Sequence, residues 1–206
     1  SRPLKEATVH HLYAGPHHTA RFVKPVPAKG SISYVSDPDK PVPYRKLPIE
    51  ATYGAGSRWR PWQVEDQRFA YTRPDVISFS TDSLAEDLTV TGAITAHLFA
   101  STTGTDADWV VKLLDVYPAW DQDNYLISGY QFPVAMEVFR GRYRKSFSKP
   151  EALVPDKPEE FVIVLHEVNH VFRKGHRLMI QVQSSWFPVI DRNPQKFVPN
   201  IYEAKN

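Results

Sequence analysis

Prolines limit what this chain can fold into more than any other residue type. The 206 residues include 18 prolines, which are spread through the sequence. Proline lacks a backbone N–H and breaks the interior of a helix, and in a sheet it is confined to edges, bulges and strand ends. The distribution therefore predicts short strands joined by many loops.

Composition and charge narrow the class of protein. Hydrophobic residues make up 42% and aromatic residues 13%, so the chain is globular, and its length fits one all-β domain with long loops or two small domains. The net charge is +2, and the basic run 140–145 is interpreted as a solvent-facing strand or turn, so no nucleic-acid partner is expected. No apolar stretch approaches the ~20 residues that cross a bilayer, so no membrane partner is expected either. The lack of cysteine excludes disulfides and thiolate nucleophiles but leaves the compartment open.

Strand-like stretches are marked by β-branched and aromatic residues, some in clear alternation. They are 75–81, 88–100, 110–117 and 177–183. In the third stretch Val111 and Leu113 share one face, which predicts a strand buried on that face and partly covered on the other. In the fourth, Leu178, Ile180 and Val182 point inward, opposite a face of long and polar side chains.

Turn residues separate these strands and complete the prediction of fold class. Gly92 falls inside the second stretch and predicts a bulge or bend. Short strands at turn-punctuated intervals, without alternating helices, favour an all-β sandwich or jelly roll. The first sixty residues differ, because their prolines and glycines indicate extended loops draped over a surface, with two strands expected near 9–13 and 31–35.

A zinc peptidase motif is the first functional candidate. His166 and His170 are four residues apart with Glu167 between them, as in H-E-x-x-H, where a helix lets both imidazoles reach one Zn²⁺ and the carboxylate polarises the bound water. His176 falls where the longer motif has its third ligand.

Three features of the sequence argue against that metal site. The longer motif requires glycine at position 173, which is arginine here, and the glycine of this chain stands at 175. The preceding run 161–165 is rich in β-branched residues, and a strand spaces residues 166 and 170 more widely than a helix does. The methionine turn of such enzymes also has no match. We therefore place these histidines on a strand and its exit turn and expect no metal ligand.

A longer series of motifs resembles a known family. The resemblance begins with the segment SYVSDPDKPVPY and covers about residues 31–204 in the order of the family. Its motifs are 33–44, 65–69, 73–81, 88–92, 105–118, 140–144, 170–178, 181–188 and 191–195. Together they resemble the C-terminal domain of the X-Pro dipeptidyl peptidase, cocaine esterase and α-amino acid ester hydrolase family, with most similarity to its glutaryl-7-aminocephalosporanic acid acylase branch.

The resemblance implies a galactose-binding-like jelly roll that carries no catalytic residue. Members have an α/β-hydrolase domain with the Ser-Asp-His triad, a helical cap and this β-domain, and the sequence has no G-x-S-x-G nucleophile elbow. Residues 1–30 are then a linker or leading strand after a hydrolase domain, and 31–206 are the jelly roll. The resemblance also allows that the last strand of the jelly roll is absent from this range. The implied partners are the hydrolase and cap domains of the same parent chain, and a homo-oligomer is compatible with it. No cofactor is expected.

Candidate site residues follow from where the domains of such a protein meet. Arg58, Trp59 and Trp62 offer flat apolar contact and one charge to a substrate pocket, although packing of both tryptophans on the domain's own face is an equal alternative. A domain interface is predicted at a loop with an Asp–Arg contact and proline corners; its residues are Trp186, Phe187, Asp191 and Arg192. An exposed apolar patch that includes Trp59, Trp62 or Trp186 is expected on the isolated domain.

Two weaker alternatives complete the set. A stand-alone carbohydrate-binding module would present Trp59 or Trp62 as an aromatic platform for sugars. Asp106 and Asp108 are spaced as a minimal Ca²⁺ pair, but two carboxylates one residue apart fit a plain loop better.

Overall fold

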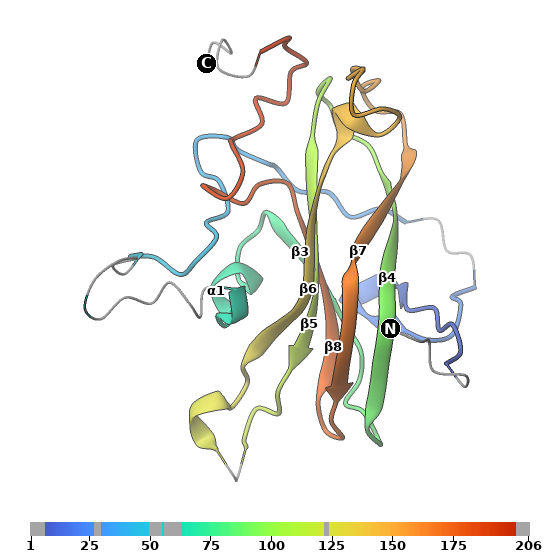
Figure 1. Ribbon diagram of the computed structural model, residues 1–206, viewed down its shortest axis with the longest axis vertical. Helices are drawn as coiled ribbons and strands as arrows, with labels where there is room; N and C mark the ends of the chain where they lie inside the picture. Colours follow the sequence, from blue (N-terminus) through green and yellow to red (C-terminus); the bar gives the residue numbers. More distant parts are fainter. Residues whose placement is uncertain (1–6, 27–29, 50–54, 56–62, 122–123, 201–206) are drawn as a thin grey trace.

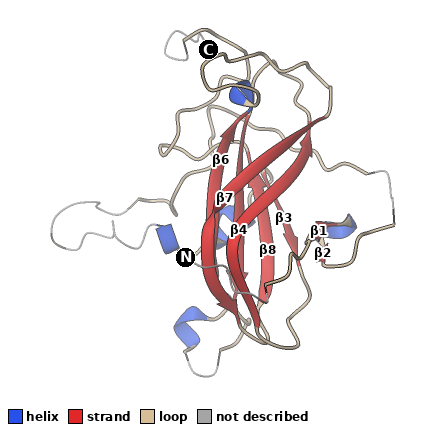
Figure 2. Ribbon diagram, turned by 45° about the vertical axis from the view of Figure 1, so that its right-hand side comes forward, coloured by secondary structure: helices blue, strands red, loops and turns tan. Residues whose placement is uncertain are grey.

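Two antiparallel sheets pack face to face in the computed structural model, which describes residues 7–26, 30–49, 55, 63–121 and 124–200 (Figures 1 and 2). The larger sheet has the strand order β3-β8-β5-β6, and β4 and β7 form the smaller one. Their bounds are β3 Val76–Ser80, β4 Leu88–Ala100, β5 Asp108–Val116, β6 Gln131–Arg140, β7 Glu159–Phe172 and β8 Arg177–Gln183. The predicted all-β sandwich is confirmed.

The remaining elements are short. They are β1 Tyr13–Ala14, β2 Ala20–Arg21, α1 Arg68–Tyr71 and the 3-10 turns η1 Pro16–His18, η3 Tyr125–Ile127 and η4 Gly141–Tyr143. In the part of the chain that the structure describes, no helix is long and apolar enough to cross a membrane. Two expectations for the N-terminal residues need correction. Only Tyr13 of the stretch 9–13 is in a strand, and 31–35 forms none, because loop residues without a partner strand gain no ladder hydrogen bonds.

The main core lies between the two sheets. It takes Val111 and Leu113 from β5 and Leu178 and Val182 from β8, as the alternation of those sequences predicts. From the smaller sheet, β7 adds Phe161, whose ring lies 4.1 Å from that of Trp109 between centroids. Side chains from both layers therefore interdigitate as in other β-sandwiches.

The pairing of β4 with β7 contains one irregularity, close to Gly92. This glycine has φ +108°, a conformation that residues with a Cβ rarely adopt, and the register shifts just after Ala93. Ala93 pairs with Glu167 and the next residue pairs with Leu165, so His166 is an extra residue without a partner. The bulge predicted near Gly92 is confirmed, and it changes which face the following β7 residues occupy.

The outer face of the larger sheet is covered, where the sequence indicated partial exposure. Lys112, Gln181 and Gln183 project there and are fully buried. Residues 42–45, 65–71 and 184–190 form this cover, as the buried side chains of Tyr44 and Trp186 show. Residues 42–45 and 65–71 are distant in sequence from β5 and β8, and alternation within a strand therefore did not reveal this cover.

Candidate functional site

The H-E-x-x-H motif lies on strand β7 and not on a helix. His166 is the exposed bulge residue, whereas His170 turns inward and its Nε2 lies 2.9 Å from Asp115 Oδ2. The bulge thus puts the two imidazoles on opposite sides of the strand. Across the described ranges, no three His, Asp or Glu side chains come together in a way that could hold a metal ion. The zinc peptidase alternative is not favoured.

Asp115 instead joins two histidines at one end of the sandwich. Its carboxylate accepts one hydrogen bond from His170 and a second from His176, whose Nδ1 lies 2.7 Å from Oδ1. Asp115 is on β5 of the larger sheet and His170 is on β7 of the smaller one, so the buried carboxylate ties the two layers together. Tyr117 packs on the His176 ring at 4.4 Å between centroids. We assign a structural role to this cluster, which the sequence analysis missed.

The three residues predicted to wall a pocket, Arg58, Trp59 and Trp62, lie outside the described residues. The segments on either side of them are firmly held. Arg45 donates two hydrogen bonds of 2.8 and 2.6 Å to the Glu65 carboxylate, and the Arg45 side chain is buried. The backbone of 42–44 pairs with Phe187, through Tyr44 N–H to Phe187 O at 2.9 Å and the reverse bond to Val42 O at 2.9 Å.

A buried lysine lies beneath this anchored segment. Lys112 Nζ donates to Gln67 Oε1 at 2.9 Å, and it lies 5.4 Å from the centroid of the Trp186 ring. Gln67 in turn donates from Nε2 to Glu65 O at 2.7 Å. Burial lowers the pKa of Lys112 to about 7. The sequence signal was a lysine flanked by apolar residues of a central strand, which alternation assigned to a partly covered face.

The residues of the predicted domain interface divide into buried and exposed members. Trp186 is buried against the outer face of its own sheet, whereas Phe187 and Arg192 are exposed. The Asp–Arg contact that holds the loop is between Asp191 and Arg140 of β6. Arg192 donates to Pro38 O at 3.2 Å and lies over the Phe187 ring. The patch prediction therefore rests on Trp59 and Trp62.

The basic run 140–145 is not the plain solvent-facing segment that the sequence indicated. All four of its cationic side chains pair with carboxylates: Arg140 with Asp191, Arg142 with Asp106, Arg144 with Glu159 and Lys145 with Glu151. Such pairing neutralises the cluster and leaves few free cations for a phosphate backbone.

Asp106 is likewise part of the protein's own ion pairing, and Asp108 is a buried carboxylate that lies within the electrostatic influence of Arg140. Asp106 is fully buried against Arg142, and Asp108, the first residue of β5, is buried beside Arg140. Burial raises the pKa of Asp108 to about 6, and Arg140 opposes that rise.

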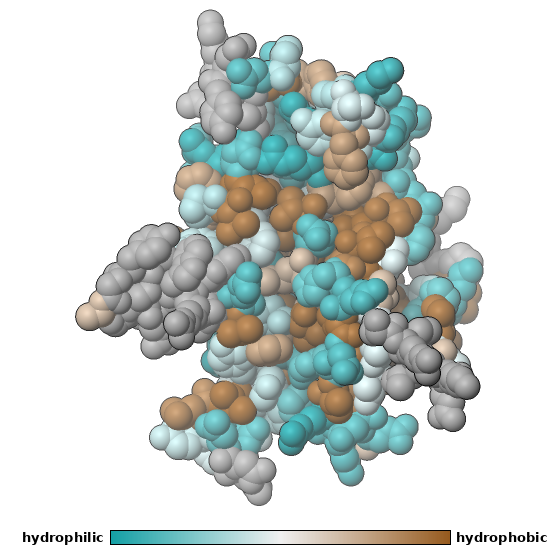
Figure 3. Space-filling model, in the orientation of Figure 1, coloured by the Kyte–Doolittle hydropathy of each residue, from teal (hydrophilic) through white to brown (hydrophobic). Residues whose placement is uncertain are grey.

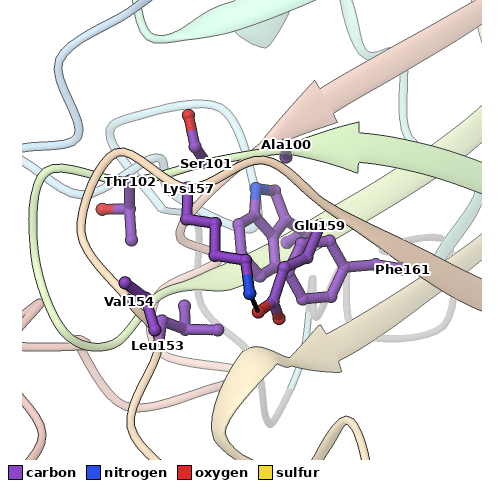
Figure 4. A pocket seen from close by; sticks show the side chains of 9 residues that line it. Ala100, Ser101, Thr102, Leu153, Val154, Lys157, Glu159 and Phe161 are labelled. Carbon is purple, nitrogen blue, oxygen red and sulfur yellow. Dashed lines mark ion pairs between the residues drawn. The ribbon is translucent and has the colours of Figure 1, made fainter.

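One indentation lies between the ends of β4 and β7 (Figure 4). The rings of Trp109 and Phe161 fill it and leave no space for a water-sized molecule, while Lys157 and Glu159 lie 3.8 Å apart in an ion pair at its edge. This indentation is a feature of core packing and not a ligand site.

In the described part of this β-sandwich, the polar clusters around Asp115, Lys112 and Asp106 are held by contacts within the domain. Residues 3–206 match the family described as the X-Pro dipeptidyl-peptidase C-terminal non-catalytic domain, and the chain belongs to that family. It is 34% identical over 161 residues to cocaine esterase of Rhodococcus sp. (strain MB1 Bresler), which is 78% of this chain and 25% of that protein.

Two solved structures are similar over nearly the whole chain. An aminopeptidase from a marine sediment archaeon, Thaumarchaeota archaeon, has 49% identity and a TM-score of 0.90 over 94% of this chain and 32% of its own. An α-amino acid ester hydrolase has 48% identity and a TM-score of 0.89 over 94% and 31%. The chain therefore spans about a quarter to a third of the length of these relatives. The predicted family and its non-catalytic jelly roll are confirmed, and the carbohydrate-binding alternative is not favoured.

Proposed function

We propose that this chain is the C-terminal part of a serine hydrolase that cleaves amino-acid esters, acylated β-lactams or X-Pro peptides. It packs on the hydrolase and cap domains and helps to wall their substrate pocket. The observation that carries the proposal is the similarity to an aminopeptidase and to an α-amino acid ester hydrolase. In both cases 94% of this chain matches about one third of the longer protein.

Exposed apolar side chains support packing against further protein. Val9, Val23, Val26 and Val35 belong to the N-terminal loops and are between 76% and 87% exposed. Apolar residues concentrated along extended loops are typical of a surface that another domain covers. Phe187 and Arg192 offer a second such surface on the cover of the larger sheet.

The anchored segment between Arg45 and Glu65 supports the role of pocket wall. A bidentate arginine–carboxylate pair fixes geometry more strictly than most contacts do, and this one joins Arg45 and Glu65, which lie on either side in sequence of Arg58, Trp59 and Trp62. In the proposed wall, the two tryptophans of this stretch give a substrate a flat apolar surface.

The test uses the longer protein that carries this domain, with and without Trp59→Ala and Trp62→Ala. Substrates are an amino-acid p-nitrophenyl ester, an acylated β-lactam and an X-Pro anilide. We expect KM for one of them to rise about tenfold, with kcat less affected, because the wall contacts substrate and not the reacting bond.

Trp120→Ala is the matched control, since Trp120 is a strongly exposed tryptophan in a different loop, and it should leave KM unchanged. The 206-residue chain alone should hydrolyse none of the three substrates. Hydrolysis by that chain would contradict the proposal, and so would an unchanged KM for every substrate in the double variant.

A further inference from the structure

A continuous series of hydrogen bonds leads from the larger sheet to the residues on either side of the segment 46–64, which contains the proposed pocket wall. Lys112 Nζ on β5 donates to Gln67 Oε1 at 2.9 Å, and Gln67 Nε2 donates to the backbone carbonyl of Glu65 at 2.7 Å. The Glu65 carboxylate accepts two hydrogen bonds from Arg45, at 2.8 and 2.6 Å. Gln67 therefore links a buried amine to the ion pair that joins both ends of this segment.

This series is shielded from water. Arg45, Gln67 and Lys112 are each no more than 2% exposed. Figure 1 shows α1, which begins directly after Gln67, beside the larger sheet on the side away from β4 and β7. The apolar side chains that Figure 3 shows over the upper parts of β6 and β7 are a separate surface, because Lys112 is fully buried. Hydrogen bonds in such surroundings are costly to break, so the position of one member constrains the next.

The side chains that the structure places next to the Lys112 amine carry no charge. Its cross-strand partners are Gln181 on β8 and Met136 on β6, and the Trp186 ring lies 5.4 Å from Nζ. The hydrogen bond to Gln67 satisfies one of the three donors that an ammonium group carries. Protonation therefore places a charge where the described residues supply no anion to pair with it, and desolvation by burial lowers the pKa of Lys112 to about 7.

The titratable side chains that the structure describes on β5 and on the cover of the larger sheet interact with other groups or face solvent. They are Arg45 with Glu65 and Tyr44, Asp66 with Arg68, Asp108 near Arg140, Asp115 with His170 and His176, and the exposed Tyr71. None of these described groups pairs with Lys112, so burial decides the charge of its amine.

We propose that Lys112 and Gln67 are positioning residues for the pocket wall, and that protonation of the Lys112 amine loosens the Arg45–Glu65 anchor and weakens substrate binding. This regulation rests on the proposed function, because the wall is the part of the site that the anchor holds. The neutral amine keeps its hydrogen bond to Gln67 without water. The ammonium form needs water for its remaining donors, and water reaches it when the cover, to which Gln67 belongs, moves away from the sheet.

Hydrogen exchange on the 206-residue chain tests the local step. The reporters are the backbone N–H groups of Tyr44 and Gln67, which donate to Phe187 O and Gln131 O, and the N–H of Val111 in the central strand β5 is the reference. We expect both reporters to exchange faster than the reference. Their protection factors should fall about tenfold from pH 8 to pH 6, because protonation of an amine with a pKa of about 7 favours the open form by that factor.

Two variants of the chain separate the amine from its surroundings. Lys112→Met removes the titrating group and keeps an apolar side chain, so the protection factors of both reporters should no longer change with pH. Gln181→Met is the matched control and should keep the change, since Gln181 is equally buried on the same face of the sheet and its side chain bonds to Gln131 and Met179. Reporters as protected as Val111, or a pH dependence that persists in Lys112→Met, would overturn the proposal.

Kinetics of the longer protein test the effect on the site. With the three substrates named above, KM of the unmodified protein should rise about tenfold from pH 8 to pH 6 relative to KM of Lys112→Met, while kcat of the two proteins follows the same pH profile. Gln67→Met should raise KM at both pH values, because it breaks the series whatever the charge of the amine. Gln181→Met should behave as the unmodified protein does.

The outcomes separate this regulation from the proposed function. A KM that responds to Trp59→Ala and Trp62→Ala, but whose pH dependence Lys112→Met leaves intact, would overturn the regulation and leave the pocket wall in place. A KM that responds to neither set of variants would refute the wall, and the regulation with it, even where hydrogen exchange shows local opening.

Discussion

Lys112 is the residue whose pKa shows most clearly the effect of its protein environment. Its side chain is fully buried, and its ammonium group donates to the neutral amide of Gln67 and lies over the face of the Trp186 ring. Desolvation by burial lowers the pKa of Lys112 to about 7, and no carboxylate among the described residues forms an ion pair with it. The consequence is a stability that depends on pH in an unusual range.

Replacing Lys112 with methionine should remove that dependence. The unfolded chain titrates this lysine near 10.5 and the folded chain near 7, so between these values the unfolded state binds the extra proton. The free energy of unfolding should therefore rise with pH across this window, by on the order of 4 kcal/mol, and the cost of the buried charge is fully present below pH 7. Urea unfolding from pH 7 to pH 10 measures the slope, which Lys112→Met should flatten and the exposed Lys149→Met should preserve. A slope shared equally by all three proteins would contradict the assignment.

The basic run supplies a second contrast between residues of similar type. Arg142 is buried with Asp106, whereas the Lys145–Glu151 pair lies in solvent. Arg142→Met should lower the free energy of unfolding by about 3–5 kcal/mol, because it leaves a buried carboxylate without its partner. Lys145→Met should change it little, since exposed pairs are screened by water. Thermal denaturation of both variants decides the point, and similar losses would show that Arg142 is not the buried partner described.

At the scale of elements, β7 carries two alternation patterns joined by one bulge. Before His166 the odd-numbered residues face the core, and after it the even-numbered residues do. The motif that resembles a zinc site thus spans the bulge: His166 is exposed, and the half-buried His170 donates to Asp115.

Neighbouring residues of β7 should respond oppositely to truncation. Phe161 is buried against Trp109, and Phe161→Ala should cost about 3–5 kcal/mol through lost contacts and the cavity left behind. Val162 faces solvent on the other side of the strand, so Val162→Ala should stay within about 0.5 kcal/mol. Chemical denaturation measures both losses of unfolding free energy, provided that the variants have the same m-value as the unmodified chain. A large loss for Val162→Ala would indicate that another layer covers this face.

At the scale of the whole molecule, the sandwich has its own core but an incomplete outer surface. The layers are joined by the Phe161–Trp109 contact and by the Asp115 cluster, and neither depends on further protein. The exposed valines of the N-terminal loops lie outside that core. We interpret them as a contact surface toward the remainder of a longer hydrolase.

The sequence by itself determined the class of fold and the positions of most central strands. Alternation in 110–117 and 177–183 and the bend at Gly92 are local properties, fixed by the two-residue period of a strand and by the freedom of glycine. The family was also readable, because its motifs recur in order along the chain.

Only the tertiary structure decided which faces are covered and which polar groups meet. The second face of β5 is buried by residues 42–45 and 65–71, and Asp115 finds its histidines more than fifty residues away. Alternation reports which side of a strand prefers an apolar environment, but it carries no information on which distant segment folds over the other side. The sequence therefore predicted that Lys112 is a polar residue on a strand, but it could not predict that its side chain is buried.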